Sequence, residues 1–239
     1  ASMLGTTATI FMPHGAALPK VQATRGYGAE VRFAGVGVTD ALVSAQEYAD
    51  ETGAILIHPF DHSDIVAGQA TVGLEIIEQL PSVSTILVPL GGGGLAAGVA
   101  LLKSEHPHIK VIGVQAESAA AYPDSLAEGM PIEANLGSTM ADGIAVAKPG
   151  DVPFELITKY LDDVIMVSEE SMSQALIGLL ERGKLLVEPA GAVAVAALLA
   201  HPDRFTGPIV PILSGGNIDA LLLLEVIRHG LASAGRFLM

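Results

Sequence analysis

Short apolar runs alternate along this sequence with longer stretches in which apolar residues recur at helical spacing. A run of about four to eight apolar residues fits a buried strand, whereas apolar residues at i, i+3 and i+4 form one face of a helix. Strands that alternate with helices form parallel sheets, because each helix returns the chain to start the next strand in the same direction. The sequence therefore predicts an α/β fold in which helices cover both faces of a parallel sheet.

The expected elements follow from these runs. Strands are expected at residues 8–12, 30–33, 54–58, 85–88, 110–114, 163–167 and 209–213. Helices are expected at residues 41–52, 65–79, 95–104, 172–182, 191–199 and 218–229. Thr39 is placed to cap the first of these helices, and Gly53 is placed to end it. Residues 119–150 are rich in Pro, Gly, Ala and Asp and are expected to form one long loop, a length typical of functional or mobile segments.

Charge and composition limit the partners of this chain. Asp and Glu outnumber Lys and Arg by 26 to 12, which gives a net charge of −14 at pH 7. Nucleic acids and anionic membrane surfaces bind clustered basic residues, so we expect neither as a partner. The absence of cysteine excludes disulfides and thiolate metal sites, and it fits a reducing compartment such as the cytoplasm. No membrane span is expected, because Pro89 with four glycines and then Glu188 interrupt the uncharged stretches.

Four consecutive glycines, Gly91, Gly92, Gly93 and Gly94, follow the strand expected at residues 85–88 and open a helix. Only glycine lets consecutive backbone N–H groups converge without Cβ clashes, and a helix start adds donors and partial positive charge. The segment lacks the Lys-Ser or Lys-Thr pair of a P-loop, and contiguous glycines fit the dinucleotide fingerprint poorly. The pattern therefore predicts a phosphate site, and the competing interpretation is a flexible turn.

A second glycine motif, Ser214-Gly215-Gly216-Asn217, follows the last expected strand. A hydroxyl at the carboxyl end of a parallel strand lies where such sheets bind ligands. The alternative is that Asn217 or Asp219 caps the next helix. Together, the two glycine motifs predict one ligand with a phosphate and a second polar atom, which indicates a small phosphorylated cofactor.

Seven short motifs are spread over nearly the whole chain, in the order in which they occur in one known protein family. They are Ala8-Thr-Ile-Phe-Met-Pro13, Pro19-Lys20 with Gly28-Ala29-Glu30-Val31, His58-Pro59-Phe60-Asp61 with Ala67-Gly68-Gln69, Gly91 to Leu95, Ala141-Asp142-Gly143, Val187-Glu188-Pro189 with Gly191-Ala192, and Ser214 to Asn217. This set resembles the fold-type II pyridoxal-phosphate enzymes, specifically their threonine dehydratase and serine racemase branch. The resemblance implies two open, twisted, mostly parallel sheets flanked by helices. It also implies that residues 1–56 are the remainder of an incomplete small domain and residues 57–239 the large cofactor domain.

The resemblance implies a role for each matching residue, with pyridoxal 5'-phosphate as the cofactor. Gly91 to Gly94 and Leu95 would hold its phosphate, and Ser214 would hydrogen-bond its pyridine nitrogen, which stays largely unprotonated beside a neutral hydroxyl. Gly143 and Glu188 would line the pocket, with the backbone of Gly143 near the reacting amine. For Glu188 an equally good interpretation is a carboxylate that stabilises the start of an alanine-rich helix.

The chemistry of this family needs a lysine that forms a Schiff base with the cofactor and moves the α-proton of the substrate. In the family it lies in a Ser-Phe-Lys-x-Arg-Gly-Ala type motif, and a Ser-Gly-Asn-His-Ala-Gln type segment binds the substrate carboxylate. This chain contains neither motif, so no catalytic residue is assigned. None of its six lysines fits by context: Lys20, Lys103, Lys110, Lys148, Lys159 and Lys184. The chain is interpreted as a piece of a longer enzyme whose small domain would expose a sheet edge and apolar surface.

The resemblance implies β-elimination from L-threonine to 2-oxobutanoate and ammonia, with L-serine as a secondary substrate, in a homo-oligomer such as a dimer or tetramer. A serine racemase-like enzyme and a non-catalytic phosphate-cofactor-binding or interaction module are the alternatives. No metal is expected: Glu117 and Ala121 match two positions of the metal-activated relatives, but Pro123 stands where a third ligand is needed. Phe60 and Asp61 are expected to shape the site without taking part in the chemistry.

Overall fold

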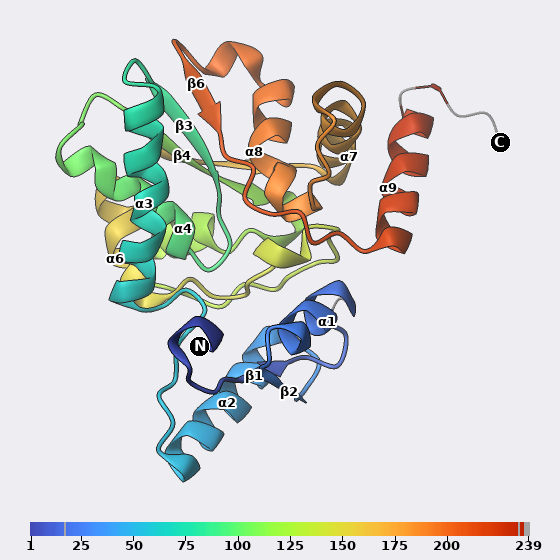
Figure 1. Ribbon diagram of the computed structural model, residues 1–239. Helices are drawn as coiled ribbons and strands as arrows, with labels where there is room; N and C mark the ends of the chain where they lie inside the picture. The colour runs from blue at the N-terminus through green and yellow to red at the C-terminus, as the bar shows by residue number, and fades with distance from the viewer. Residues whose placement is uncertain (17, 234, 237–239) are drawn as a thin grey trace. The chain divides into compact units, whose positions relative to one another are not determined.

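The computed structural model describes residues 1–16, 18–233 and 235–236. The chain divides into two compact units: unit 1 is Ala1–His58 with Asn217–Ala220, and unit 2 is Pro59–Gly216 with Leu221–Met239. Each unit has its own parallel sheet, with two strands in unit 1 and four in unit 2 (Figure 1). None of the described helices is long and apolar enough to cross a membrane.

Unit 1 is built on two parallel strands, β1 (Thr9–Met12) and β2 (Glu30–Phe33), which pair from Thr9 with Glu30 to Met12 with Phe33. Its other elements are a 3-10 turn (Ser2–Leu4) and the helices α1 (Leu18–Gly26) and α2 (Val38–Thr52). Only a few of its apolar side chains are buried, and several large ones are exposed, among them Met3 and Val36. Unit 1 therefore has a small core.

Two expectations for unit 1 are wrong and one is confirmed. Residues 54–58 form no strand, because no neighbouring strand pairs with them in the described chain, and Ile55 is 90% exposed. The start of α2 is not capped by Thr39: the Asp40 carboxylate accepts hydrogen bonds from the N–H groups of Val36 and Gly37, which lower its pKa. Gly53 does end α2, at a φ of 73° that favours glycine.

Unit 2 is a four-stranded parallel sheet in the order β5-β4-β3-β6. The strands are β3 (Thr85–Pro89), β4 (Lys110–Ala116), β5 (Asp163–Val167) and β6 (Ile209–Pro211). The helices are α3 (Ser63–Gln79), α4 (Gly94–Ala100), α5 (Tyr122–Glu128), α6 (Asp151–Tyr160), α7 (Glu169–Gly178), α8 (Pro189–Ala200) and α9 (Ala220–Ser233).

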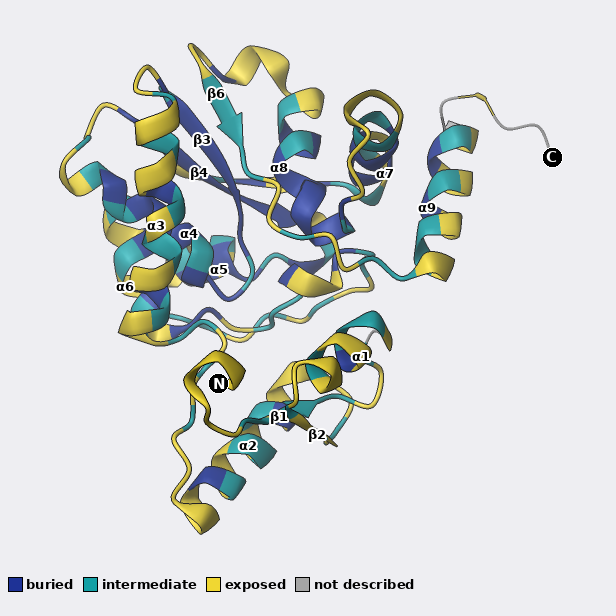
Figure 2. Ribbon diagram, in the orientation of Figure 1, coloured by how far each residue is buried: buried dark blue, intermediate teal, exposed yellow. Residues whose placement is uncertain are grey.

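Side chains of β3 alternate between two apolar cores on opposite faces of the sheet. Ile86 and Val88 pack with residues of α3, α4 and α6, whereas Leu87 packs with residues of α7 and α8. All three side chains are fully buried, and the ribbon of β3 carries the colour of buried residues in Figure 2. Helices therefore cover both faces of the sheet, which confirms the predicted α/β fold.

Several predicted boundaries in unit 2 are corrected by the structure. Residues 119–150 are not one loop, because Pro123 lies in the first turn of α5 and Gly129 ends that helix at a φ of 73°. The helix expected at residues 95–104 continues after α4 as a 3-10 turn (Leu101–Ser104). The helix expected at residues 172–182 ends as a π-turn (Leu179–Gly183). The last strand ends at Pro211, and α9 begins at Ala220, two residues later than expected.

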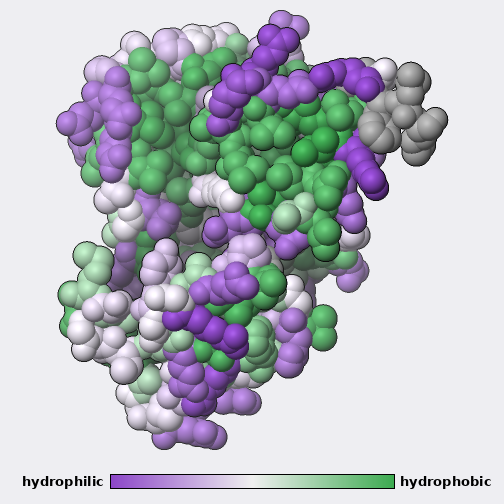
Figure 3. All heavy atoms as spheres, turned by 45° about the vertical axis from the view of Figure 1, so that its right-hand side comes forward, coloured by the Kyte–Doolittle hydropathy of each residue, from purple (hydrophilic) through white to green (hydrophobic). Residues whose placement is uncertain are grey.

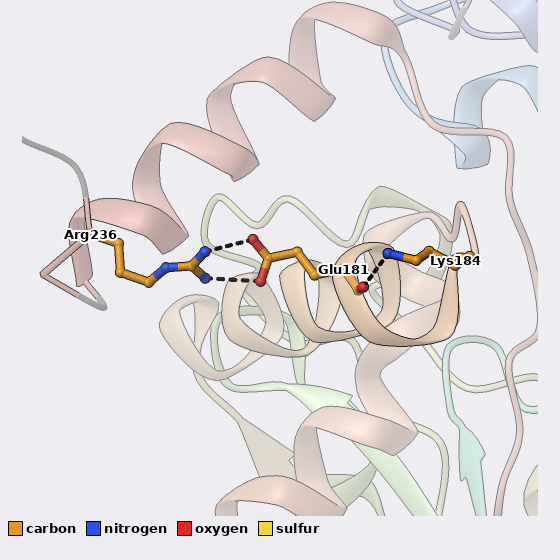
Figure 4. A network of polar contacts seen from close by, with 3 residues as sticks. All are labelled: Glu181, Lys184 and Arg236. Atoms are coloured by element: carbon orange, nitrogen blue, oxygen red, sulfur yellow. Dashed lines mark hydrogen bonds and ion pairs between the residues drawn. The ribbon is translucent and has the colours of Figure 1, made fainter.

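A small polar network connects the π-turn after α7 to Arg236, which follows α9 (Figure 4). Two N–H groups of Arg236 donate to the Glu181 carboxylate at 2.8 and 2.9 Å. Lys184, with a φ of 57°, donates to the Glu181 carbonyl at 2.6 Å. Exposed apolar side chains lie nearby in the sequence, at Leu185 and Leu186, and Figure 3 shows apolar surface on the face that carries α7 and α9.

Candidate functional site

The two glycine motifs follow adjacent strands of the unit 2 sheet. From β3 the chain crosses to β4 on one side, whereas β6 pairs with β3 on the other side, with Leu87 opposite Pro211. The N–H of Ile212 extends this pairing to the carbonyl of Leu87 at 2.9 Å. Open parallel sheets bind ligands at the carboxyl ends of strands where the connections diverge in this way. The Gly91 and Ser214 segments therefore lie at the position where this fold places a ligand.

Protein atoms fill the space on the side-chain side of all four glycines. A Cβ on Gly91 would lie 2.9 Å from the Ile144 Cα, and a Cβ on Gly92 would lie 2.5 Å from the Phe60 ring. Gly93 has a φ of 105°, and the Tyr122 hydroxyl occupies the place of its Cβ. The Phe60 backbone also crowds Gly94. Close packing alone thus requires glycine at these positions, which gives the glycine run a structural reason that the sequence analysis did not include.

The N–H groups of the same loop are without protein acceptors. Gly92, Gly93 and Gly94 are buried. Yet in the described chain no hydrogen bond joins an N–H of Gly91 to Leu95 to a backbone or side-chain acceptor. Buried N–H groups in folded proteins are nearly always paired, so a row of unpaired donors indicates a place for an anion. The attraction for an anion comes mainly from the N–H groups of the loop. The dipole of α4 adds little, because this helix has only seven residues.

The start of α8 packs against the loop after β6. The N–H of Glu188 donates to the Gly215 carbonyl at 3.1 Å. A Cβ on Gly191 would lie 2.6 Å from that same carbonyl oxygen, so the two segments pack backbone against backbone. Ser214 itself is exposed. This packing fixes Ser214 at the end of β6, beside the end of β3.

Glu188 joins the predicted pocket residues into one cluster. Its Oε1 crowds Gly215 and would lie 3.7 Å from a Cβ on Gly143. Its Oε2 is buried and has no hydrogen-bond partner among the described residues, and the carboxylate makes no capping hydrogen bond at α8. Since Ile144 contacts Gly91, the cluster runs continuously from Gly91 through Gly143 to Glu188. An unpaired buried carboxylate oxygen in this position indicates a ligand-facing group.

Leu95 differs from the four glycines before it, because its side chain packs against the core. It lies half-buried in the first turn of α4 and packs against the core shared by α3 and α6. Asp61, from the segment before α3, accepts a hydrogen bond from the N–H of Val152 at 2.9 Å and so caps α6. The Phe60 ring, as described above, lies against Gly92. These side chains support the glycine loop from behind.

Three of the lysines have described contacts with residues outside this cluster. Lys103 pairs with Asp162, and the Lys159 ammonium lies 4.7 Å from the centre of the Tyr160 ring. Lys184 is held at the π-turn. The remaining three are at the start of β4, in the segment before α6, and in α1 of unit 1: Lys110, Lys148 and Lys20.

Sequence reasoning missed two residues of this region, Tyr122 and Gln115. The Tyr122 hydroxyl donates to the Gly92 carbonyl at 3.2 Å, and the Gln115 Oε1 accepts from the Tyr122 N–H at 3.1 Å. Both side chains are fully buried. Tyr122 lay in the segment expected to be a loop, and Gln115 followed the end of an expected strand, so neither carried a pattern that pointed to the glycines.

A cofactor-dependent enzyme class accounts for this arrangement. Residues 1–215 match the family described as pyridoxal-phosphate dependent enzyme, and the chain belongs to this family. The predicted family and its cofactor, pyridoxal phosphate, are thereby confirmed.

Curated relatives carry a more specific name. The chain is 46% identical over 240 residues to L-threonine ammonia-lyase of Geobacter sulfurreducens, covering 100% of this chain and 60% of the relative. It is 44% identical over 237 residues to L-threonine ammonia-lyase of Thermotoga maritima, covering 99% and 59%. The chain thus spans about three fifths of the length of these relatives.

Solved structures agree with the fold. The processed form of threonine deaminase isoform 2 from Solanum lycopersicum superposes with a TM-score of 0.88 at 34% identity, covering 95% of this chain and 67% of that one. Maize serine racemase gives a TM-score of 0.87 at 32% identity, covering 98% and 73%. A threonine deaminase and a serine racemase are therefore both among its structural neighbours.

Proposed function

We propose that this chain forms the cofactor-binding part of a pyridoxal-phosphate-dependent ammonia-lyase that converts L-threonine to 2-oxobutanoate and ammonia, with L-serine as a secondary substrate. The cofactor site rests on one observation above all: the N–H groups of three consecutive buried glycines, Gly92, Gly93 and Gly94, have no acceptor in the described chain, at the divergence of β3 and β6. The substrate is proposed from the relatives named L-threonine ammonia-lyase.

The residues present fit the cofactor. The N–H groups of Gly91 to Leu95 would donate to its phosphate, and the Ser214 hydroxyl at the end of β6 would face the ring nitrogen. Gly143 and Glu188 would form the wall between these two ends, with the unpaired Glu188 Oε2 turned to the ligand. When bound, the cofactor supplies an electron sink for charge that develops at the substrate α-carbon. The residues of this chain bind and orient it, and no proton transfer is assigned to them.

Two other functions have support in particular observations. A serine racemase-like activity is supported by the maize structure. A non-catalytic module that binds a phosphorylated ligand is supported by Lys103, Lys159 and Lys184, whose described contacts are with residues other than Gly91, Gly143 and Glu188. The ammonia-lyase is preferred because the higher identities belong to proteins of that name.

We further propose that residues 1–56 belong to the small domain and residues 57–239 to the large cofactor domain, and that the enzyme works in the cytoplasm as a homo-oligomer in amino-acid metabolism, including isoleucine biosynthesis. The domain proposal is supported by the separate parallel sheet of unit 1. The cytoplasmic proposal is supported by the absence of cysteine, as expected for a protein that needs no disulfides.

Two measurements test the proposed function. Isothermal titration of the purified chain with pyridoxal 5'-phosphate should show saturable binding of one equivalent that inorganic phosphate competes away, whereas pyridoxal, which has no phosphate, should bind far more weakly. Absence of binding would overturn the cofactor site. The intact gene product should then form 2-oxobutanoate from L-threonine with a higher kcat/KM than it shows for L-serine. Faster formation of D-serine would favour the racemase, and cofactor binding without turnover would favour the module.

A further inference from the structure

The carbonyl of Gly92 receives two hydrogen bonds from behind the glycine loop. The Tyr122 hydroxyl donates to it at 3.2 Å, and the Gly150 N–H donates to it at 3.0 Å. Tyr122 is fully buried, and its ring stacks on Phe154 with a centroid distance of 6.3 Å. Burial raises the pKa of Tyr122, and the charge of Asp61 adds to this, so the hydroxyl keeps its proton and remains a donor.

The orientation of this carbonyl determines that of the next N–H. In a trans peptide, the C=O of one residue and the N–H of the following residue point in opposite directions. Two donors that hold the Gly92 carbonyl therefore turn the Gly93 N–H the other way, to the side where no described protein acceptor meets it. Glycine at both 92 and 93 leaves the peptide free to rotate on steric grounds. The two hydrogen bonds to the Gly92 carbonyl therefore favour one orientation of this peptide.

Gln115 holds Tyr122 in place. Its Oε1 accepts from the Tyr122 N–H at 3.1 Å, which ties the first residue of α5 to the end of β4. The other half of the amide, Nε2, is buried and has no hydrogen-bond partner in the part of the chain that the structure describes. A buried unpaired donor is destabilising, and an apolar side chain of similar size would avoid it. An apolar side chain would, however, lack the oxygen that accepts the hydrogen bond from the Tyr122 N–H.

We propose that Gln115 and Tyr122 are positioning residues for the phosphate site: Gln115 fixes Tyr122, and Tyr122 with Gly150 fixes the Gly92–Gly93 peptide so that the Gly93 N–H faces the ligand. This inference rests on the proposed function, because it assigns the glycine loop to a phosphate. Neither side chain is expected to touch the ligand, since Gln115 bonds Tyr122 and the Tyr122 hydroxyl lies against the Cβ side of Gly93.

The variants Tyr122→Phe and Gln115→Met test this inference, because each keeps the size of the side chain while removing one hydrogen bond. Tyr160→Phe is the matched control: Tyr160 lies at the end of α6 in the same unit, with its ring beside Lys159. Dissociation constants for inorganic phosphate and pyridoxal 5'-phosphate are measured by isothermal titration, well below each melting temperature. Both test variants should weaken both ligands by about five- to tenfold, as expected for one lost hydrogen bond, and the control by less than about twofold.

A structural role alone would give a different result. It would lower the melting temperature of Tyr122→Phe and Gln115→Met and leave both dissociation constants unchanged, which would overturn the proposal. A second readout needs no ligand: with ¹⁵N-glycine labelling, the Gly93 amide signal of Tyr122→Phe should shift or broaden, while that of Tyr160→Phe should not. If the wild-type chain binds neither probe, the proposed function fails, and an unchanged Gly93 signal would then overturn the positioning role separately.

Discussion

Within the glycine loop, Gly93 is the residue at which backbone conformation and packing together require glycine. Its φ is 105°, and the Tyr122 hydroxyl occupies the place of a Cβ. Gly93→Ala should therefore lower the free energy of unfolding by about 2–4 kcal/mol, from overpacking and backbone strain, and should abolish phosphate binding. Gly178→Ala in α7 is the control, since Gly178 has a helical φ of −58° and open space at its Cβ.

The control should be as stable as the wild type or more stable by up to about 1 kcal/mol, because alanine is the better helix former. Urea unfolding of the three proteins measures the difference, and phosphate titration follows the site. A Gly93→Ala variant of wild-type stability that still binds phosphate would show that the loop adapts to a side chain.

Tyr122 should also change how stability depends on pH. Its pKa is raised by burial, so the folded state keeps the proton at pH values where the unfolded state, with a pKa of about 10, releases it. Stability from this group is complete below pH 10 and is lost as the pH rises above that value. At pH 11 the loss should be about 1.4 kcal/mol. Urea unfolding at pH 9 and pH 11 should show this extra loss in the wild type but not in Tyr122→Phe, and equal losses would contradict it.

At the scale of elements, α3 and α4 pack so closely that one added methyl group between them should disrupt their packing. A Cβ on Gly98 in α4 would lie 2.7–2.8 Å from backbone atoms of Val66, Gln69 and Ala70 in α3. Backbone atoms cannot turn away as a side chain can, so Gly98→Ala should cost about 2–3 kcal/mol of unfolding free energy. Gly68→Ala, also in α3 but with open space at its Cβ, should be neutral or gain up to about 1 kcal/mol. Thermal and urea unfolding of both variants provide the measurement, and equal effects would argue against the close approach of the two helices.

The pair of Arg236 and Glu181 is expected to matter much less than these packing contacts. Their side chains are 53% and 40% exposed, so solvent screens the attraction. The hydrogen bonds of Arg236 lower the pKa of Glu181, so the stabilisation is present above the unfolded pKa of about 4.3 and is lost as the pH falls below it. Arg236→Gln should lower Tm by no more than about 2–4 °C at pH 7. The difference should vanish at pH 3 or in 1 M salt, and a larger, salt-independent drop would show that Arg236 has another role.

At the scale of the molecule, the sequence predicted what depends on local pattern and missed what depends on distant partners. The apolar run at Ile86, Leu87 and Val88 predicted a buried strand, because such a run is visible in the sequence without knowing the neighbours. The four consecutive glycines after β3 likewise predicted a phosphate site from the local sequence alone. Its second cause, crowding by Phe60 and Tyr122 from behind, needs the three-dimensional arrangement.

The errors have similar physical causes. Pro123 and Gly129 suggested a loop, but the same residue types also start and end a short helix, and only the burial of Tyr122 decides between these outcomes. Residues 54–58 have the composition of a strand, yet a strand forms only where another is available to pair with it. No local sequence pattern indicates that the Oε2 of Glu188 is left unpaired.

The two units should respond differently to a ligand. Unit 1 buries few large side chains, chiefly Val21 with the smaller Ala41 and Ala49, whereas unit 2 has extensive cores on both faces of its sheet. Amide hydrogen exchange should therefore be much faster in β1 and β2 than in β3 and β4. The proposed phosphate site lies within unit 2, so inorganic phosphate at about 100 times its dissociation constant should stabilise that unit by about 2.7 kcal/mol. Exchange through global unfolding of unit 2 should slow by about 100-fold, with no change in unit 1. Equal slowing in both would mean that the units unfold together, and no slowing in either would contradict a phosphate site at the glycine loop.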